Sequence, residues 1–470
     1  MSREVASSGS RMSFGIPMGS PTGFKTRPTA TIIIILVNVL IYVLTSYESF
    51  FIESSDYWVS MGGFIPSLIE TPIQWYRVFT SMFLHADFFH ILFNMYFLYV
   101  FGRAVESILG KLRFLLLYLT AGVAASIFHT AFSFLGGLSA YTVPAIGASG
   151  AISGILGAYL ILYPGTYLVV GWGFILLPMF FRIKAAYYII FWFATQVIYG
   201  FTRTAGSTAV FAHAGGFVMG IALLSLLADK RRIAMFRMLR AYSLVPYLMP
   251  INLKKRGLGF FSKTIITVFM VLLLAGAAYA SSGLAVQGTI KSTITQYTCE
   301  GVLYVDYVGI QLPDLESQIA SVSLDTTRIL LNRLNAAELL YNRTNSNGEI
   351  VLSGKSTGLP VMVRVGSTVS IVNVNTTIHY FIGTYDSDGF LSGGEGNLTT
   401  RAVSIVLYGQ LYRIVESEPI NYVFKITSQT VDLPVLMRCV GVLSTSITLA
   451  ALFVVVKKNG ELTLIEESKS

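Results

Sequence analysis

The stretch AIGASGAISGILGAYL, residues 145–160, places Ser149 among small residues at the start of an apolar segment. As a helix, the run from Ser149 to Tyr163 is roughly 22 Å long, which is too short for the roughly 30 Å hydrocarbon core of a bilayer. Its first turn must therefore lie below a membrane surface. Non-helical backbone at that depth is tolerated only where it is buried within the protein or lines a water-filled cavity. We expect Ser149 at the floor of a water-filled cavity open to the outside. Taken alone, a serine among glycines is more often a sign of close helix packing than of a nucleophile.

The composition around this stretch is that of an integral membrane protein. Of 470 residues, 54% are hydrophobic and 12% are charged, and the apolar residues are clustered. The clusters predict eight membrane helices, of which the fourth and fifth are short. They are Thr31–Thr45, Phe88–Ile108, Phe114–Phe134, Ser149–Tyr163, Ala185–Tyr199, Ala209–Ala228, Thr264–Ala280 and Pro434–Val456.

Lysine and arginine are distributed asymmetrically over the short loops. With the N-terminus in the cytoplasm, the external short loops hold only Arg77 and Arg203, and the other basic loop residues are cytoplasmic. This pattern predicts a multi-pass protein of the cell membrane with both termini in the cytoplasm. The net charge of +9 is therefore assigned to contact with the lipid bilayer, and no nucleic-acid partner is predicted. The basic segment 229–263 favours an interfacial helix on anionic lipid.

The region 283–431 has a different pattern. Its runs, such as RAVSIVLYGQLYRIV, alternate or are β-branched, and NSNGE and DSDGF are turn sequences. A mostly β extracytoplasmic domain is predicted, with TTRILLNRLNAAELLY as one helix inside it. Three N-x-S/T sequons, at Asn342, Asn375 and Asn397, all fall within this region, which supports an external location.

These patterns divide the chain into seven segments. The segments are a disordered cytoplasmic tail (1–29), a six-helix core (30–228), a basic cytoplasmic linker (229–263), a seventh membrane helix (264–282), the extracytoplasmic β-rich domain (283–431), an eighth membrane helix (434–456) and a cytoplasmic tail (457–470).

Neither a metal nor a cofactor is predicted, because no spacing of cysteine and histidine suits zinc and the sequence has no phosphate-binding loop.

Polar side chains inside the predicted spans are the candidate functional residues, because they are costly in a bilayer. His213, Gly216 and Gly220 share one helix face, and the serine helix carries its own row of glycines. Two such faces permit the close approach that a serine-to-imidazole hydrogen bond of about 2.6–3.2 Å requires. His90 and Asn94, at i and i+4, can both donate to an oxyanion. Since no intramembrane Asp or Glu suits the orientation of His213, a Ser–His dyad is predicted.

Three stretches carry a family resemblance: WYRVFTSMFLHADFFHILFNMYFLYVFGRAVESILG, GASGAISGILGAY and AHAGGFVMG. They resemble the signature regions of rhomboid intramembrane serine proteases, and the resemblance covers residues 30–228. It implies a six-helix rhomboid core in which Ser149 is the nucleophile and His213 is the general base and acid. It also implies an oxyanion hole formed by His90, Asn94 and the Ser149 N–H.

Six supporting positions match the family as well. The resemblance implies that Arg77 and Glu106 hold the membrane-embedded loop between helices one and two, and that His85 lies near the cavity. It also implies that Gly147 begins the turn before the serine, and that Gly216 and Gly220 keep the dyad helices in contact. Three positions depart from the family. Tyr76 precedes the arginine where tryptophan is usual, although Trp75 is one residue earlier, and Arg103 replaces a second glycine. Ser153 replaces the aromatic residue that usually stacks on the histidine, so a looser His213 is expected.

The resemblance implies an endopeptidase whose substrates are transmembrane proteins cleaved near the outer membrane face. The helix Ala185–Tyr199 and the loop 200–208 would form its gate and cap, and the domain 283–431 would recruit substrates or shield the cavity. Two other functions were considered. A non-catalytic rhomboid-like protein would bind membrane clients, but such relatives typically lack the serine or the histidine. A transporter would show buried carboxylates or inverted repeats.

Overall fold

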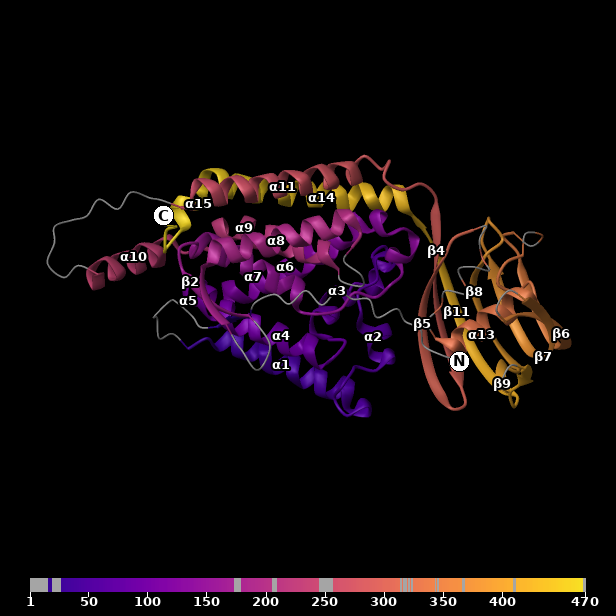
Figure 1. The fold of residues 1–470 in the computed structure, drawn as a ribbon. Coiled ribbons are helices and arrows are strands. Elements are labelled where there is room, and N and C mark those ends of the chain that lie inside the picture. Colours follow the sequence, from indigo (N-terminus) through magenta and orange to yellow (C-terminus); the bar gives the residue numbers. More distant parts are fainter. Residues whose placement is uncertain are drawn as a thin grey trace. The chain divides into compact units, whose positions relative to one another are not determined.

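The computed structural model describes residues 16–18, 27–172, 179–204, 209–244, 257–312, 324–342, 346–365, 368–408 and 411–467, with single residues 315, 319, 322 and 344. The chain forms two compact units. One comprises Gly288–Asp432, and the other comprises the remaining described residues. Figure 1 shows that the first unit is built mainly of strands and the second mainly of helices.

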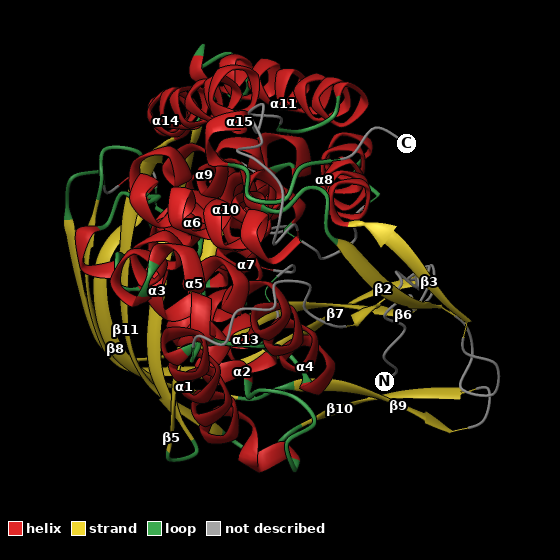
Figure 2. Cartoon of the chain, turned by 90° about the vertical axis from the view of Figure 1, so that its left-hand side faces the viewer, coloured by secondary structure: helices red, strands yellow, loops and turns green. Residues whose placement is uncertain are grey.

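The helical unit is a bundle around α7 (Ser149–Leu162). Every α7 residue after Ser149 is buried, and the helix contacts α6, α8 and α9 (Figure 2). The serine at the first position of α7 is therefore its one partly exposed residue. The other helices are α1 (Thr29–Ser46), α2 (Asp56–Gly62), α3 (Arg77–Thr80), α4 (Phe88–Phe97), α5 (Arg103–Leu109), α6 (Lys111–Phe132), α8 (Ala185–Thr202), α9 (Val210–Leu227), α10 (Lys230–Leu244), α11 (Phe260–Ser281), α14 (Leu433–Phe453) and α15 (Asn459–Leu462).

Within the described residues, six helical segments are long and apolar enough to cross a membrane. Helices also form at the two remaining predicted spans, but α7 has only 14 residues, and α8 does not meet the same criteria. The sequence of α8, AAYYIIFWFATQVIYGFT, contains tyrosines, threonines and a glutamine, which lower its hydropathy. The six segments are Thr29–Ser49, Phe88–Leu109, Lys111–Gly136, Val210–Leu227, Phe260–Ser281 and Leu433–Leu462.

The two additional membrane helices, α11 and α14, pack against the core and against each other. A Cβ added at Gly441 of α14 would lie 2.4 Å from the Ser281 nitrogen of α11, so only glycine permits this approach. α14 also contacts α6 and α9, and α11 contacts α8 (Figure 1). The core and the two additional helices therefore form one bundle.

Two segments differ from the sequence prediction. Ile16–Met18, inside the tail predicted to be disordered, forms strand β1, which pairs with β2 (Tyr167–Trp172). β2 pairs in turn with β3 (Met179–Lys184), in a region for which no strand was predicted. The edge of the β2–β3 hairpin offers unpaired backbone groups, and this tertiary partner leaves no periodic signal in the tail. Apart from residues 16–18 and 27–29, the predicted tail lies outside the described residues, as do 205–208 of the cap loop and 245–256 of the linker.

The segment after α14 contacts the C-terminal end of α7. The Leu464 N–H donates to the Leu162 carbonyl at 2.7 Å, and the Thr463 hydroxyl donates to the Ile161 carbonyl at 2.8 Å. The last carbonyls of a helix have no partner within it, so these bonds satisfy groups that would otherwise be unpaired. Residues after α14 are thus part of the packed structure around the serine helix.

The β unit is an antiparallel six-stranded sheet with the order β5-β4-β11-β8-β7-β6. Its helix, α13 (Asp325–Ala336), ends five residues before the predicted end, because Glu338 takes a left-handed conformation (φ 57°). The sheet strands are β4 (Thr289–Cys299), β5 (Val302–Ile310), β6 (Glu349–Val365), β7 (Thr368–Tyr385), β8 (Leu391–Thr400) and β11 (Ile420–Asp432), and a separate hairpin is formed by β9 (Val403–Tyr408) and β10 (Leu411–Glu416).

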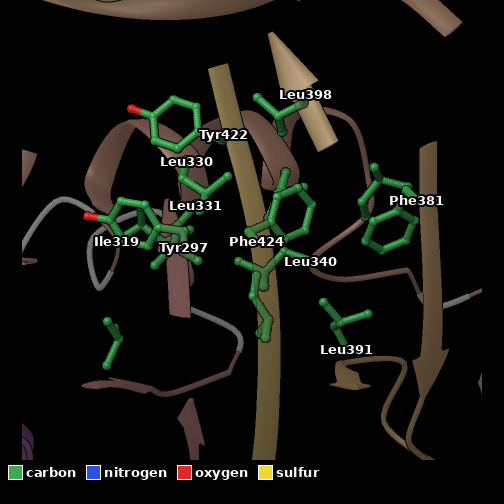
Figure 3. Packing of buried hydrophobic residues seen from close by; sticks show 14 of the residues in the cluster. Tyr297, Ile319, Leu330, Leu331, Leu340, Phe381, Leu391, Leu398, Tyr422 and Phe424 are labelled. Atoms are coloured by element: carbon green, nitrogen blue, oxygen red, sulfur yellow. The ribbon is translucent and has the colours of Figure 1, made fainter. Parts of the chain in front are cut away.

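One face of this sheet carries the core of the β unit. On β11 the buried Tyr422, Phe424 and Ile426 alternate with exposed residues, as the period of a strand requires. Figure 3 shows Phe424 beside Phe381 of β7, with Leu330 and Leu331 of α13 nearby. The alternating sequence pattern thus has its expected cause, which is a sheet covered on one face.

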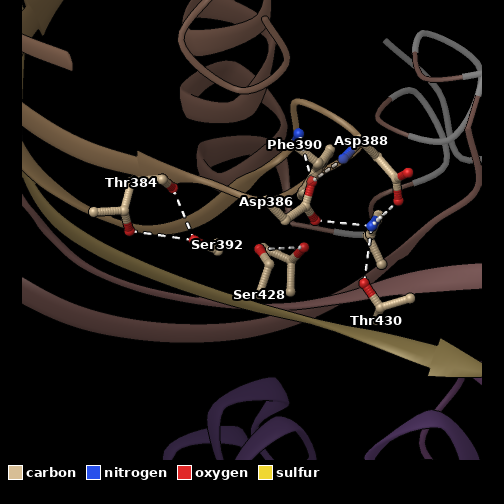
Figure 4. Close-up of polar contacts among 9 residues, drawn as sticks. Thr384, Asp386, Asp388, Phe390, Ser392, Ser428 and Thr430 are labelled. Atoms are coloured by element: carbon tan, nitrogen blue, oxygen red, sulfur yellow. Dashed lines mark hydrogen bonds and ion pairs between the residues drawn. The ribbon is translucent and has the colours of Figure 1, made fainter. Parts of the chain in front are cut away.

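A buried lysine links β4 to β11 and to the turn between β7 and β8. Lys291 of β4 is 3% exposed, and its amine contacts Asp386 Oδ2 at 2.8 Å, Asp388 Oδ2 at 2.5 Å and Thr430 Oγ1 at 2.8 Å. The two aspartates belong to the turn after β7, where Asp386 also accepts the Phe390 N–H (Figure 4). Burial lowers the pKa of Lys291, but its hydrogen bonds with Asp386 and Asp388 outweigh this effect, so the pKa lies above that of an ordinary lysine.

Replacing Lys291 with methionine is expected to lower the protection of β4 and β11 amides about tenfold or more, since hydrogen bonds to charged groups contribute about 1.5–3 kcal/mol. Because the folded-state pKa is raised, this stabilisation is complete below about pH 10 and is lost as the pH rises through that pKa. Hydrogen exchange between pH 6 and 9 should show the difference. Lys425→Met, at an exposed position of β11, is the control. Equal protection in all three proteins would contradict the assigned role.

Candidate active site

Ser149 and His213 lie within hydrogen-bond distance of each other. Ser149 is the first residue of α7, and His213 lies in the first turn of α9. Ser149 Oγ is 2.8 Å from His213 Nε2, and both side chains are partly buried. The two side chains that sequence reasoning selected from different helices therefore meet in the arrangement of a nucleophile and a base.

Glycines bring the two helices this close. A Cβ at Gly216 of α9 would lie 1.9 Å from the Gly150 carbonyl oxygen, and one at Gly220 would lie 1.9 Å from the Gly154 oxygen. In the other direction, a Cβ at Gly157 of α7 would lie 2.3 Å from a carbonyl oxygen of α9. The backbones of α7 and α9 are thus in direct contact, and the Ser149–His213 distance depends on that contact.

The turn before α7 places His90 beside the serine. Gly147 has φ 120°, a conformation that residues with a side chain rarely adopt, and its N–H donates to the Ser81 carbonyl at 2.8 Å. A Cβ built on Gly147 would lie 2.7 Å from His90 Nε2 and 3.6 Å from Ser149 Oγ. His90 and Ser149 therefore flank the same point next to the glycine. A side chain at position 147 would fill the space between them.

Asn94 lies one turn further along α4. Its amide donates to the His90 carbonyl at 2.8 Å, which engages one of its two N–H groups. His90 Nδ1 accepts the Ala86 N–H at 3.3 Å, and Asp87 caps α4 through the His90 N–H. These bonds fix the His90 ring with its Nε2 toward Gly147.

A small cavity lies directly behind the nucleophile. Its volume is about 40 Å³, enough for a water molecule, which needs roughly 10–15 Å³. It is lined by Ser149, Gly147, Ser81, Ser126 and His129, among others. His129 of α6 lies at this cavity as well. The polar lining provides the hydrogen-bond partners that a buried water requires.

Comparison with known proteins identifies this part of the chain. Residues 72–230 match the family profile described as Rhomboid domain. The chain contains a rhomboid domain. The candidate residues predicted from the sequence, from Arg77 to Gly220, all lie within the matched range.

Several relatives with a similar domain are named as proteases. The chain is 37% identical over 134 residues to Rhomboid protease GluP of Bacillus subtilis, and the aligned region covers 28% of this chain and 24% of the relative. It is 28% identical over 222 residues to Rhomboid protein 1, mitochondrial, of Saccharomyces cerevisiae, which is 44% of this chain and 58% of the relative. It is 39% identical over 94 residues to Putative rhomboid protease YdcA of Bacillus subtilis, which is 19% of this chain and 42% of the relative. The chain therefore spans between a quarter and somewhat over half of the length of these relatives.

Arg77 and Glu106 were both expected to hold the loop between the first two helices, but the structure places them apart. Arg77 is buried and donates to the Ser60 and Gly63 carbonyls at 2.7 and 2.8 Å, so it contacts the segment that connects α1 to α4. Glu106 does not contact this loop, so the prediction that it holds the loop is corrected. Its carboxylate accepts the Ala30 and Thr31 N–H groups at 2.8 Å and caps the start of α1. A carboxylate is favoured there because the first N–H groups of a helix lack partners.

His85, which lies just before α4, contacts the turn that precedes Ser149. It is fully buried, and its Nε2 accepts the Ala148 N–H at 3.4 Å. Its ring meets the His90 ring edge to face, with centroids 5.1 Å apart. His85 therefore supports both the residue before Ser149 and the neighbouring histidine.

The structure adds a residue that sequence reasoning missed. Gln196 of α8 is 7% exposed, and its Oε1 lies 2.8 Å from His213 Nδ1. The predicted dyad rests on the absence of a suitable intramembrane carboxylate, whereas a glutamine inside an apolar helix is also a costly polar group. That signal in the sequence of α8 could have identified it.

Helix α8 also places an aromatic ring, that of Trp192, beside His213. The Trp192 ring centroid is 6.0 Å from that of His213, with the planes inclined by 34°. Ser153, which stands where rhomboid proteases usually have the stacking aromatic, instead donates to the Ser149 carbonyl at 2.6 Å. The looser histidine expected from Ser153 is thus offset by contacts from α8.

Proposed function

We propose that the chain is an intramembrane serine endopeptidase that cleaves transmembrane proteins by a rhomboid-type mechanism. The observation that carries this proposal is the 2.8 Å contact between Ser149 Oγ and His213 Nε2 at the start of a buried helix. A serine needs an adjacent base to act as a nucleophile, and this geometry supplies one. The protease names of the relatives support the same chemistry.

The proposed reaction is acyl transfer in two steps. Ser149 Oγ attacks the peptide carbonyl carbon while His213 Nε2 takes the hydroxyl proton, and the C–N bond then breaks as His213 returns that proton to the leaving amine. Water then attacks the ester, His213 accepts its proton, and Ser149 is released with its hydroxyl restored. The Ser149 N–H and His90, whose Nε2 lies next to Gly147, would stabilise the oxyanion together with Asn94, one turn further along α4.

The proposed substrates are membrane proteins whose helices unwind near the outer membrane face. Carbonyls in a helix are hydrogen-bonded, so the cleaved segment must unwind, which favours substrates with small or helix-breaking residues there. The proposed entry is past α8 and the loop that follows it, as a gate and a cap. The distribution of lysine and arginine supports a location in the cell membrane with cytoplasmic termini and an external β unit. Recruitment of substrates is the role proposed for that external unit.

The test is to locate the nucleophile chemically. The full-length protein in proteoliposomes is treated with a fluorophosphonate, digested and analysed by mass spectrometry. The adduct is expected on the peptide that contains Ser149 and on no other serine of the rhomboid domain. An adduct elsewhere would contradict the assignment of Ser149. The absence of any adduct would favour a protein that binds membrane clients without cleaving them.

A further inference from the structure

We propose that Gln196 is a positioning residue that holds His213 in the protonation state required of a base. This inference rests on the proposed function, because it concerns how the histidine activates Ser149. It replaces the predicted dyad with a Ser–His–Gln triad whose third member comes from α8. The relevant contacts are those that fix the amide of Gln196 and those that fix the imidazole.

The amide of Gln196 has one orientation that satisfies its surroundings. Its Nε2 donates to the Thr195 hydroxyl at 3.3 Å and to the Trp192 carbonyl at 3.5 Å. Rotating the amide by 180° would place Oε1 against that carbonyl, and two acceptors cannot bond. The group that faces His213 Nδ1 at 2.8 Å is therefore the carbonyl oxygen Oε1.

An amide oxygen has no proton, so the hydrogen in this bond must belong to His213. The imidazole is then protonated on Nδ1, and its Nε2 carries the lone pair in the neutral form. That lone pair faces Ser149 Oγ at 2.8 Å, as proton abstraction requires. The opposite tautomer would place a hydrogen between Nε2 and Ser149 and would leave two acceptors facing each other at Nδ1.

A neutral amide suits this place better than a carboxylate. A buried charge without a full set of partners is costly in a bilayer, whereas an amide offers the same acceptor at lower cost. Cysteine proteases with a Cys-His-Asn arrangement use an amide for the same purpose. Gln196 and Trp192 hold the imidazole from α8, and Ser149 contacts it from α7, so the ring is fixed from two helices.

The experiment compares Gln196→Met, which keeps the size but removes the acceptor, with Gln196→Glu, which keeps an acceptor. The rate of reaction with a fluorophosphonate is measured from pH 5 to 9 in proteoliposomes. Gln196→Met is expected to react about tenfold more slowly, since one neutral hydrogen bond contributes about 0.5–1.5 kcal/mol, or up to a factor of about ten. Gln196→Glu should react near the wild-type rate at high pH.

The pH profile separates positioning from a merely structural role. A carboxylate at position 196 favours the protonated imidazole, so the acidic limb of the Gln196→Glu profile should move up by about one pH unit or more. Among the described residues, the other titratable groups that act on His213 are His90 of α4 and His129 of α6, which are unchanged in these variants. Val197→Ala, at a buried position next to Gln196, controls for packing of α8 and should leave the limb in place.

The outcomes distinguish this inference from the proposed function. A wild-type protein that does not react at any pH would overturn the proposed function and this inference with it. A reactive wild type together with wild-type rate and profile in Gln196→Met would overturn the role of Gln196 alone. An unshifted acidic limb in a Gln196→Glu variant, shown to be folded by its thermal stability in the same proteoliposomes, would also overturn it.

Discussion

The His213→Ala variant is expected to react with a fluorophosphonate at least about 10³-fold more slowly than the wild-type protein. Members of a serine triad act as a unit, and losing the histidine alone removes most of the catalytic acceleration. His213 Nε2 lies 2.8 Å from Ser149 Oγ, and no other nitrogen among the described residues has a hydrogen bond to that oxygen. Without this base, Ser149 is an ordinary alcohol.

Ser149→Ala should abolish the reaction altogether, because it removes the atom that forms the bond. Two variants serve as controls. Ser153→Ala removes a hydroxyl one turn away on α7, and His379→Ala removes an exposed histidine of the β unit. Both are expected to react like the wild type. Retained reactivity in Ser149→Ala, or a loss in His379→Ala equal to that in His213→Ala, would contradict the proposed chemistry.

The Gly216→Val variant is expected to lose about 10²-fold in reactivity while still inserting in the membrane. Its Cβ would lie 1.9 Å from the Gly150 carbonyl oxygen, so α7 and α9 must separate by roughly 1 Å or more to restore ordinary contact. The backbone of α7 carries Ser149 with it, and a misplacement of about 1 Å at a reacting pair can cost about 10²-fold. The loss should appear in the reaction rate and as a lower melting temperature.

Two further variants test whether helix separation is the cause. Gly220→Ala introduces the same 1.9 Å conflict one turn further from the dyad, at the Gly154 oxygen, and should lower the rate less. Leu226→Val places a valine in α9 at a position that is 79% exposed and should change neither quantity. Reactivity of Gly216→Val equal to that of Leu226→Val would show that α7 and α9 need not touch for catalysis.

The predictions from sequence were most successful where the signal is local to one helix. The glycine spacing of AHAGGFVMG and the short run after Ser149 indicated a close helix pair with a serine at its start, and the structure has this pair. The role of Glu106 was predicted wrongly, because its sequence neighbours say nothing about which helix start it faces. Its carboxylate caps α1, more than 70 residues earlier in the chain.

The sequence by itself determined where helices form, which of their faces are small enough to pack closely, and where a mostly β region begins. These properties follow from hydropathy, periodicity and glycine content, which are carried by neighbouring residues. The tertiary structure alone decided that β1 pairs with β2 and that Gln196 and Trp192 reach His213. Such contacts depend on how each helix is rotated about its axis and how deep it lies, and these are set by packing of the whole bundle.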